Sequence, residues 1–324
     1  MEVMKNSILN DMSNVDVTQM LTDSKSLIPK DLIIDETQWK GLVWAVLRGR
    51  NVLIVGPTRC GKTKAAQSVA KALNRPFFYF NLGSTQDARA TLIGNTTFKK
   101  EQGTIFNPSE FVRAIQTENA VILLDELSRG HHDAWNILMP VLDSTQRYLR
   151  LDESVESSII KIPTSITFVS TTNIGLQYTA TKVIDEATSR RFPVIVEMEP
   201  LDFDGEMKLL KILFENDFEE NKDYFNDICN ISHDTKKQAK LDDAPISRFI
   251  PTGIVIEMAQ MVIDGFSLKE LAELSIYPMF DKDGGTESER LYIKQLVQKY
   301  IDTNASAAPN PIKGKKGGLK THKF

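Results

Sequence analysis

One short stretch of the chain restricts its fold more than any other feature. It runs Gly56-Pro57-Thr58-Arg59-Cys60-Gly61-Lys62-Thr63 and fits the pattern G-x-x-x-x-G-K-[ST], which is typical of phosphate-binding loops. Residues 51–55 read as a buried strand and residues 64–73 as a helix, so the loop has the flanks that this pattern requires. The order of strand, glycine-rich loop and helix predicts an α/β fold with a site for an anion.

Each part of this loop is suited to holding a nucleotide. The glycines let the backbone turn tightly enough for N–H groups to point at phosphate oxygens, and the helix N-terminus adds a partial positive charge. Lys62 is expected to contact the β- and γ-phosphates, and the Thr63 hydroxyl to ligate the Mg²⁺ that accompanies the nucleotide. Cys60 lies beside the helix start, where a thiol pKa can be lowered, but we favour a small residue that offers only its backbone.

A second motif lies in the run from Ala120 to Glu126. Its apolar residues in succession predict a strand that is buried on both faces, as in a parallel sheet. Asp125 and Glu126 follow at the carboxyl end of that strand, where open α/β sheets bind their ligands. We expect Asp125 to hold the magnesium through its hydration shell and Glu126 to polarise a water molecule that attacks the γ-phosphate.

Composition excludes several classes of protein. The 324 residues include 41% hydrophobic and 25% charged residues, as expected for a globular protein of about two domains. The net charge of -4 argues against a surface built wholly for nucleic acid. We expect a cytoplasmic protein without membrane contact, because no apolar run reaches the ~18 residues of a membrane span and the N-terminus lacks a signal pattern. Cys60 and Cys229 suggest no disulfide framework.

The rest of the first two hundred residues alternates predicted helices, strands and hairpins. A strand at 166–173 places Asn173 where it could orient the same attacking water, and a short helix at 184–191 ends in Arg190 and Arg191. His131 and His132 lack metal-ligand spacing and are interpreted as surface residues. The other predicted elements are helices at 36–47, 109–117 and 133–142, the last broken by Pro140, strands at 76–82 and 194–196, and hairpins at about 95–104 and 147–162.

In this order the motifs resemble those of AAA+ ATPases. The phosphate loop, the Asp125-Glu126 pair, Asn173 and the ending Ser189-Arg190-Arg191-Phe192 occur as they do in that superfamily. The segment Leu92-Ile93-Gly94 and both hairpins are similar to the MoxR group, most of all to the CbbQ/NirQ/NorQ activators and the AAA+ subunit of cobaltochelatase. The resemblance covers roughly residues 38–300. It implies an α/β P-loop NTPase core with a parallel sheet, followed by a small all-helical lid.

The resemblance also implies an assembly and an activity. It predicts an ATP- and Mg²⁺-dependent ring, hexameric in this group, with Arg191, or Arg190, reaching the nucleotide of the neighbouring subunit as an arginine finger. The hairpins would face the pore of the ring and grip a client protein, which the ring would remodel, activate or load with metal. Members of the group often work with a partner that carries a von Willebrand factor A domain.

The domain boundaries follow from the same pattern. Residues 1–37 read as a partly helical lead-in, 38–200 as the nucleotide-binding core, 201–302 as the lid and 303–324 as a disordered, lysine-rich tail. In the lid we expect helices at 203–218, 254–263, 268–274 and 287–301, with Lys236 and Lys237 in a loop. Gly253 stands where the group usually has an arginine that touches the γ-phosphate, and Arg248 could replace it.

Two alternative functions remain open at this point. A nucleic-acid motor or loader is favoured by Lys99 and Lys100 in the first hairpin and by the lysine-rich tail, but the acidic net charge weighs against it. An ATP-gated assembly scaffold with little turnover is consistent with Gly253, whereas an intact Glu126 favours hydrolysis.

Overall fold

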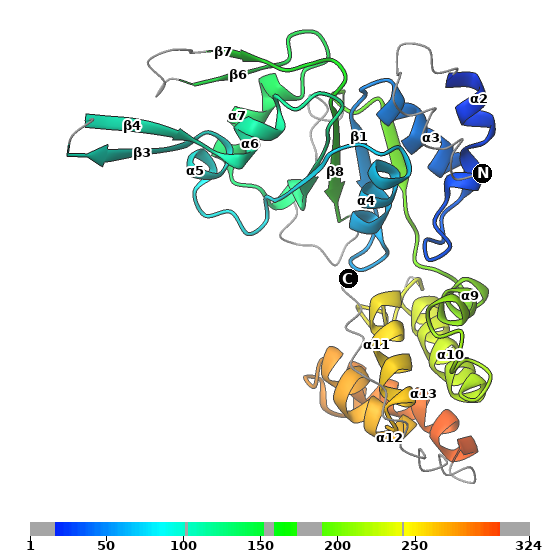
Figure 1. Ribbon diagram of the computed structural model, residues 1–324. Helices are drawn as coiled ribbons and strands as arrows, with labels where there is room; N and C mark the ends of the chain where they lie inside the picture. Colours follow the sequence, from blue (N-terminus) through cyan, green and yellow to red (C-terminus); the bar gives the residue numbers. More distant parts are fainter. Residues whose placement is uncertain (1–16, 101–102, 152–158, 174–189, 242, 305–324) are drawn as a thin grey trace. The chain divides into compact units, whose positions relative to one another are not determined.

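The computed structural model describes residues 17–100, 103–151, 159–173, 190–241 and 243–304. The chain divides into two compact units, residues 1–200 and 201–324 (Figure 1). The short helix predicted at 184–191, the turn of the second hairpin and the lysine-rich tail lie wholly or largely outside the described residues. No helix in the described part of the chain is long and apolar enough to cross a membrane.

The first unit is built on a parallel sheet. Among the described residues five strands pair in the order β2-β5-β8-β1-β9, and every pairing is parallel. The predicted parallel core is therefore confirmed. The strands are β1 (Val52–Val55), β2 (Phe77–Asn81), β5 (Val121–Asp125), β8 (Thr167–Thr172) and β9 (Val194–Glu197).

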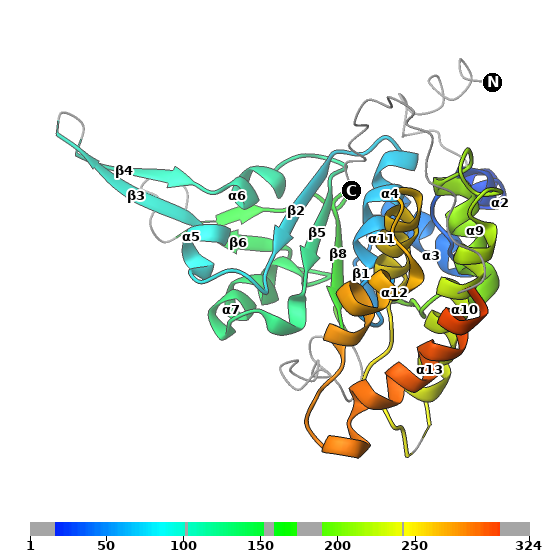
Figure 2. The same cartoon turned by 90° about the horizontal axis from the view of Figure 1, so that it is seen from below.

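Helices cover both faces of this sheet because its central strands are apolar on both sides. Helices α3 and α4 pack with Ile54, Leu123 and Val169 on one face. Helices α5, α6 and α7 pack with Leu53, Ile122 and Phe168 on the other (Figures 1 and 2). The bounds are α3 (Glu36–Leu47), α4 (Lys62–Ala72), α5 (Ala88–Leu92), α6 (Glu110–Ala114) and α7 (His132–Val141), preceded by α2 (Val17–Thr22) and the 3-10 turn η2 (Ser24–Leu27).

Both predicted hairpins are present in the first unit. Strands β3 (Gly94–Lys99) and β4 (Gly103–Pro108) pair antiparallel, and so do β6 (Tyr148–Arg150) and β7 (Ile159–Lys161). The β3–β4 hairpin extends well away from the five-stranded sheet (Figure 2). These strands form two small sheets of their own and do not widen the five-stranded sheet.

The second unit consists of helices around one apolar core. Phe225, Ile228 and Ile231 are fully buried in it and recur at helical spacing along α10. The helices are α9 (Phe203–Leu213), α10 (Lys222–Gln238), α11 (Thr252–Ile263), α12 (Leu268–Leu271) and α13 (Glu289–Asn304). Shorter turns are the π-helical Ala272–Ile276 and the 3-10 segments Tyr277–Met279 and Gly285–Glu287.

Three predictions about helices were wrong. The loop assigned to Lys236 and Lys237 belongs to the last turn of α10, a helix whose polar composition hid the spacing of its buried residues. Helix α9 ends at Leu213 and does not reach Phe218. Pro140 does not break α7, because it lies one residue before the end of the helix at Val141, so almost no helix follows it.

The helical unit contains a buried ion pair that predicts a large effect on stability. Lys236 Nζ lies 2.5 Å from Glu206 Oε1, and the side chains are 8% and 0% exposed. Lys236→Ala would leave the Glu206 carboxylate buried without its cation, so we expect a loss of about 3–5 kcal/mol in the free energy of unfolding. Urea unfolding of the full chain measures this loss. Lys237→Ala, at the exposed neighbouring position, should change it by no more than about 0.5 kcal/mol, and equal losses in both variants would contradict the expectation.

Candidate functional site

The loop from Gly56 to Thr63 joins the carboxyl end of β1 to the start of α4, as the sequence predicted. Gly56 has φ +153°, and a Cβ there would lie 2.1 Å from the carbonyl oxygen of Met198. Gly61 has φ +96° and caps α4, while Arg59 adopts the left-handed region at φ 59°. Glycine is thus required at Gly56 both for its backbone angle and for its close approach to the neighbouring segment.

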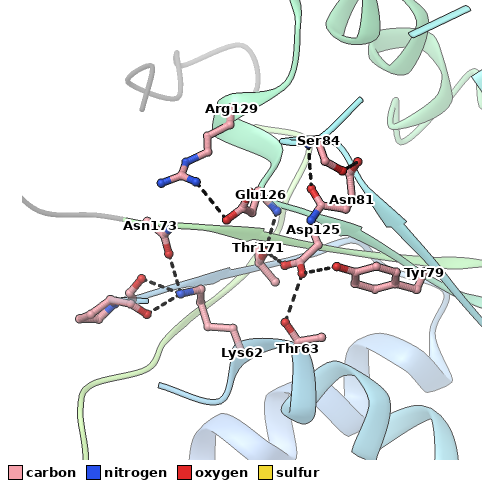
Figure 3. Close-up of polar contacts among 12 residues, drawn as sticks. Lys62, Thr63, Tyr79, Asn81, Ser84, Asp125, Glu126, Arg129, Thr171 and Asn173 are labelled. Carbon is pink, nitrogen blue, oxygen red and sulfur yellow. Dashed lines mark hydrogen bonds and ion pairs between the residues drawn. The ribbon is translucent and has the colours of Figure 1, made fainter. Parts of the chain in front are cut away.

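Lys62 points back into this loop (Figure 3). Its ammonium donates to the carbonyl oxygens of Gly56 (2.8 Å) and Pro57 (2.5 Å) and to Asn173 Oδ1 (2.8 Å). The side chain is 8% exposed, and burial lowers the Lys62 pKa from its usual range. The structure therefore brings together Lys62, the first residue of α4, and Asn173, which follows β8.

The Asp125 carboxylate is surrounded by hydroxyl groups. Thr63 Oγ1 donates to Oδ2 over 3.3 Å, and the Tyr79 hydroxyl donates to the same oxygen over 3.0 Å. Thr171 Oγ1 donates to Oδ1. Burial and the Asp125 charge raise the Tyr79 pKa. These donors come from α4, β2 and β8, so separate parts of the core fix one carboxylate (Figure 3).

Glu126 is held in an uncommon backbone conformation next to Asp125. Its φ is 55°, in the left-handed region, and its N–H donates to Thr171 Oγ1 over 3.0 Å. The carboxylate forms an ion pair with Arg129 at 3.3 Å (Figure 3). On its other side lies Gly83, where an added Cβ would be 2.2 Å from Glu126 Oε2 and 3.0 Å from Glu126 Cβ.

The remaining loop residues have smaller roles in this geometry. Thr58 and Arg59 are exposed, and Pro57 contributes its carbonyl oxygen to Lys62. Burial raises the pKa of the Cys60 thiol, which favours the interpretation that this residue serves as a small backbone position.

Some predicted site residues lie elsewhere. Arg190 and Arg191 precede β9, where Arg191 Nε donates to the Met139 carbonyl oxygen at 3.1 Å and the Arg191 carbonyl oxygen accepts from the Asn51 amide at 3.0 Å. Asn51 precedes β1, so Arg191 lies at the amino edge of the sheet and the phosphate loop at the carboxyl edge. Gly253 and Arg248 belong to the helical unit.

Several side chains that shape the site were not among the predicted site residues. Thr171 shares the polar strand end with Asn173, and that cluster could have suggested its role. Tyr79 and Gly83 could not be found without the pairing of β2 with β5, which puts Asn81 opposite Asp125. Arg129 follows Glu126 by one helical turn, a spacing that permits an ion pair.

The site fits a nucleotide with magnesium. Hydroxyl and carboxylate oxygens are the ligands that Mg²⁺ prefers, and one or two carboxylates beside phosphates suffice for it. Thr63 and Asp125 supply such oxygens next to the loop. Within the described residues, no group of three or more His, Cys, Asp or Glu side chains gathers to hold another metal.

Comparison with known proteins agrees with this geometry. Residues 51–211 match the family model described as AAA domain (dynein-related subfamily). An uncharacterized protein of Staphylococcus saprophyticus is 26% identical over 173 residues, which cover 52% of this chain and 63% of the relative. Mitochondrial Lon protease homologs of Dictyostelium discoideum and Yarrowia lipolytica are 29% and 32% identical, over 50% and 49% of this chain but only 17% and 13% of their own length. The chain thus spans less than two thirds of the length of each of these relatives. Domains of the matched AAA family use ATP with Mg²⁺.

The close approach of Gly83 to Glu126 yields a prediction. Gly83→Ala should push the Glu126 carboxylate aside, because the new methyl group would overlap both its Oε2 and its Cβ. We expect the rate constant of ATP hydrolysis to fall at least tenfold while the affinity for ATP changes little, since the phosphate loop is untouched. Phosphate release and binding of a fluorescent ATP analogue measure the two quantities. Gly41→Ala in α3, where the nearest atom would be 3.8 Å away, is the control; unchanged hydrolysis in Gly83→Ala would show that Glu126 tolerates the methyl group.

Proposed function

We propose that this chain, whose residues 51–211 form an AAA+ ATPase domain, is a cytoplasmic ring protein of the MoxR kind that uses ATP hydrolysis to remodel or activate a client protein, or to drive metal insertion into it. The observation that carries the proposal is the convergence of five side chains at one edge of the five-stranded sheet: Lys62, Thr63, Asp125, Glu126 and Asn173. The same unit contains two hairpins outside that sheet.

The chemistry follows from the chain's own side chains. ATP with Mg²⁺ supplies the phosphoryl group and spreads the charge that develops on it. Lys62 would exchange its loop carbonyl partners for phosphate oxygens, which are stronger acceptors for a cation. Glu126 would accept a proton from the attacking water. Asn173 would orient either that water or the γ-phosphate for the attack. One carboxylate oxygen of Glu126, Oε1, forms the ion pair with Arg129, three residues further on.

The hairpins support a role in gripping a protein chain. Phe98 on β3 is 76% exposed and Ile159 on β7 is 53% exposed, so each hairpin presents a large apolar side chain to solvent. An exposed apolar side chain on a hairpin is suited to binding an unfolded or flexible segment of another protein. This observation favours a protein client, whereas the exposed Lys100 at the tip of the first hairpin is what favours nucleic acid.

The position of Arg191 supports assembly into a ring. It lies at the amino edge of the sheet, about one strand length, or ~13 Å for four residues, from the carboxyl edge where the phosphate loop begins. A side chain there serves a nucleotide on a neighbouring subunit better than the nucleotide of its own chain. We therefore propose a homo-oligomer, hexameric as in related rings, in which Arg191, or Arg190, completes the neighbour's site.

The arginine finger is tested by the concentration dependence of hydrolysis. Arg191→Ala should lower the rate constant several hundredfold, because charge on the transferring phosphoryl group would lose its stabilising cation. Hydrolysis by the unmodified protein should rise with protein concentration as the ring forms. Arg190→Ala is the matched variant, with a smaller effect expected. Full activity of Arg191→Ala, or a specific activity independent of concentration, would rule out Arg191 as a finger in trans.

The client is tested with a trapped ring. Glu126→Gln should bind ATP and hydrolyse it very slowly, so clients stay bound during a pull-down. Half of each sample is treated with nuclease, and retained proteins are identified by mass spectrometry. The double variant Glu126→Gln with Phe98→Ser serves as the control, because it retains the ATP site and loses the exposed aromatic side chain of Phe98.

We expect one specific protein, or a pair that includes a von Willebrand factor A domain, in both halves and depleted from the Phe98→Ser control. Retention that disappears with nuclease would instead make the chain a nucleic-acid motor. A chain that assembles on ATP but releases no phosphate even without the Glu126→Gln change would be a scaffold.

A further inference from the structure

The proposed ATP site does not explain why a tyrosine, Tyr79, contacts the Asp125 carboxylate. It belongs to β2, the strand at one edge of the five-stranded sheet. Its hydroxyl donates to Asp125 Oδ2 over 3.0 Å, and Thr63 Oγ1 donates to the same oxygen over 3.3 Å. Thr63 is the predicted ligand of magnesium. Tyr79 therefore touches the carboxylate on the side where the metal is expected.

The strand register explains how an edge residue reaches this carboxylate. Tyr79 lies opposite Leu123, and Asn81 lies opposite Asp125. Since side chains alternate along a strand, Tyr79, Leu123 and Asp125 share one face of the sheet, the face that α4 covers. The Tyr79 side chain therefore reaches diagonally across to Asp125, two residues beyond Leu123 on β5. Long aromatic side chains can span that distance.

Packing does not account for a tyrosine at this position. Phe78 and Phe80, on the opposite face of β2, pack against the apolar core, and Phe80 is only 8% exposed. Tyr79 is 48% exposed. A residue needed only for packing would be more deeply buried, so its hydroxyl and not its ring is the part that the neighbouring site uses.

The hydroxyl groups around Asp125 restrict how its carboxylate can turn. Oδ2 accepts from Thr63 and Tyr79, and Oδ1 accepts from Thr171. A carboxylate offers about four acceptor positions. Because three of these positions are used by donors from three different elements, the plane of the Asp125 carboxylate is fixed.

We propose that Tyr79 is a positioning residue for the magnesium that accompanies ATP, acting through the Asp125 carboxylate. The inference rests on the proposed function, because it assumes that Mg²⁺ and ATP bind at this site. Loss of the hydroxyl would let the carboxylate rotate, so the metal would bind more weakly while the phosphate loop kept its own contacts. The defect should thus be one of metal affinity, and a higher concentration of magnesium should overcome it.

The test measures metal binding without turnover. In the Glu126→Gln background, Mn²⁺ replaces Mg²⁺, and its binding in the presence of ATP is followed by electron paramagnetic resonance. Tyr79→Phe keeps the ring and removes only the hydroxyl. We expect the apparent dissociation constant for Mn²⁺ to rise about tenfold, the effect of one hydrogen bond to a charged group, while binding of ATP in the presence of a metal chelator stays unchanged. Tyr148→Phe, on the β6 strand of the second hairpin, is the control.

A second readout separates positioning from a structural role. With Glu126 intact, the magnesium concentration at half-maximal hydrolysis should rise in Tyr79→Phe, and saturating magnesium should restore the rate constant. A variant that is merely misfolded would have a lower melting temperature and would not be rescued by metal.

The outcomes also separate this inference from the proposed function. If the Glu126→Gln protein binds Mn²⁺ with ATP but Tyr79→Phe changes the dissociation constant less than twofold, Tyr79 has no positioning role and the proposed ATPase stands. If the Glu126→Gln protein binds no Mn²⁺ with ATP at all, the proposed function itself fails.

Discussion

The parallel pairing of β8 with both of its neighbours is the constraint on which the site depends. Strand β8 pairs with β5 on one side and with β1 on the other, so the ends of all three strands meet at one edge. That edge collects the phosphate loop after β1, the two acids at the end of β5 and Asn173 after β8. Thr171 on β8 then contacts Asp125 and the backbone of Glu126 together. A one-residue shift of β8 would turn this side chain to the other face and break both contacts.

The same edge of the sheet stabilises the buried charge of Lys62 when no nucleotide is bound. Lys62 is nearly buried, yet each of its three N–H donors has an oxygen partner in the loop or at Asn173. A buried cation without such partners would be very costly. Because the partners are carbonyl and amide oxygens, and not carboxylates, a nucleotide phosphate can replace them at a favourable exchange.

Sequence alone was sufficient where a pattern repeats over many residues or fixes a backbone angle. It located the phosphate loop, the strands of the core and α3 with its bounds, since apolar runs and glycine positions act locally. It failed at α10, where Phe225, Ile228 and Ile231 lie among polar residues and the helix is stabilised by tertiary packing. It also missed Tyr79 and Gly83, because their contacts with Asp125 and Glu126 arise from the pairing of strands distant in sequence. The roles of Arg190, Arg191 and Gly253 stay predictions, since each concerns a neighbouring subunit or the other compact unit.

We propose that Lys62 binds ATP and that Glu126 activates the water that hydrolyses it, both at the carboxyl edge of this sheet. The most direct test compares phosphate release and binding of a fluorescent ATP analogue in the unmodified protein, Lys62→Ala and Glu126→Gln. We expect hydrolysis by the unmodified protein, loss of ATP binding in Lys62→Ala, and ATP binding with turnover reduced about 100-fold or more in Glu126→Gln. Full hydrolysis by Glu126→Gln, or retained tight binding in Lys62→Ala, would contradict it.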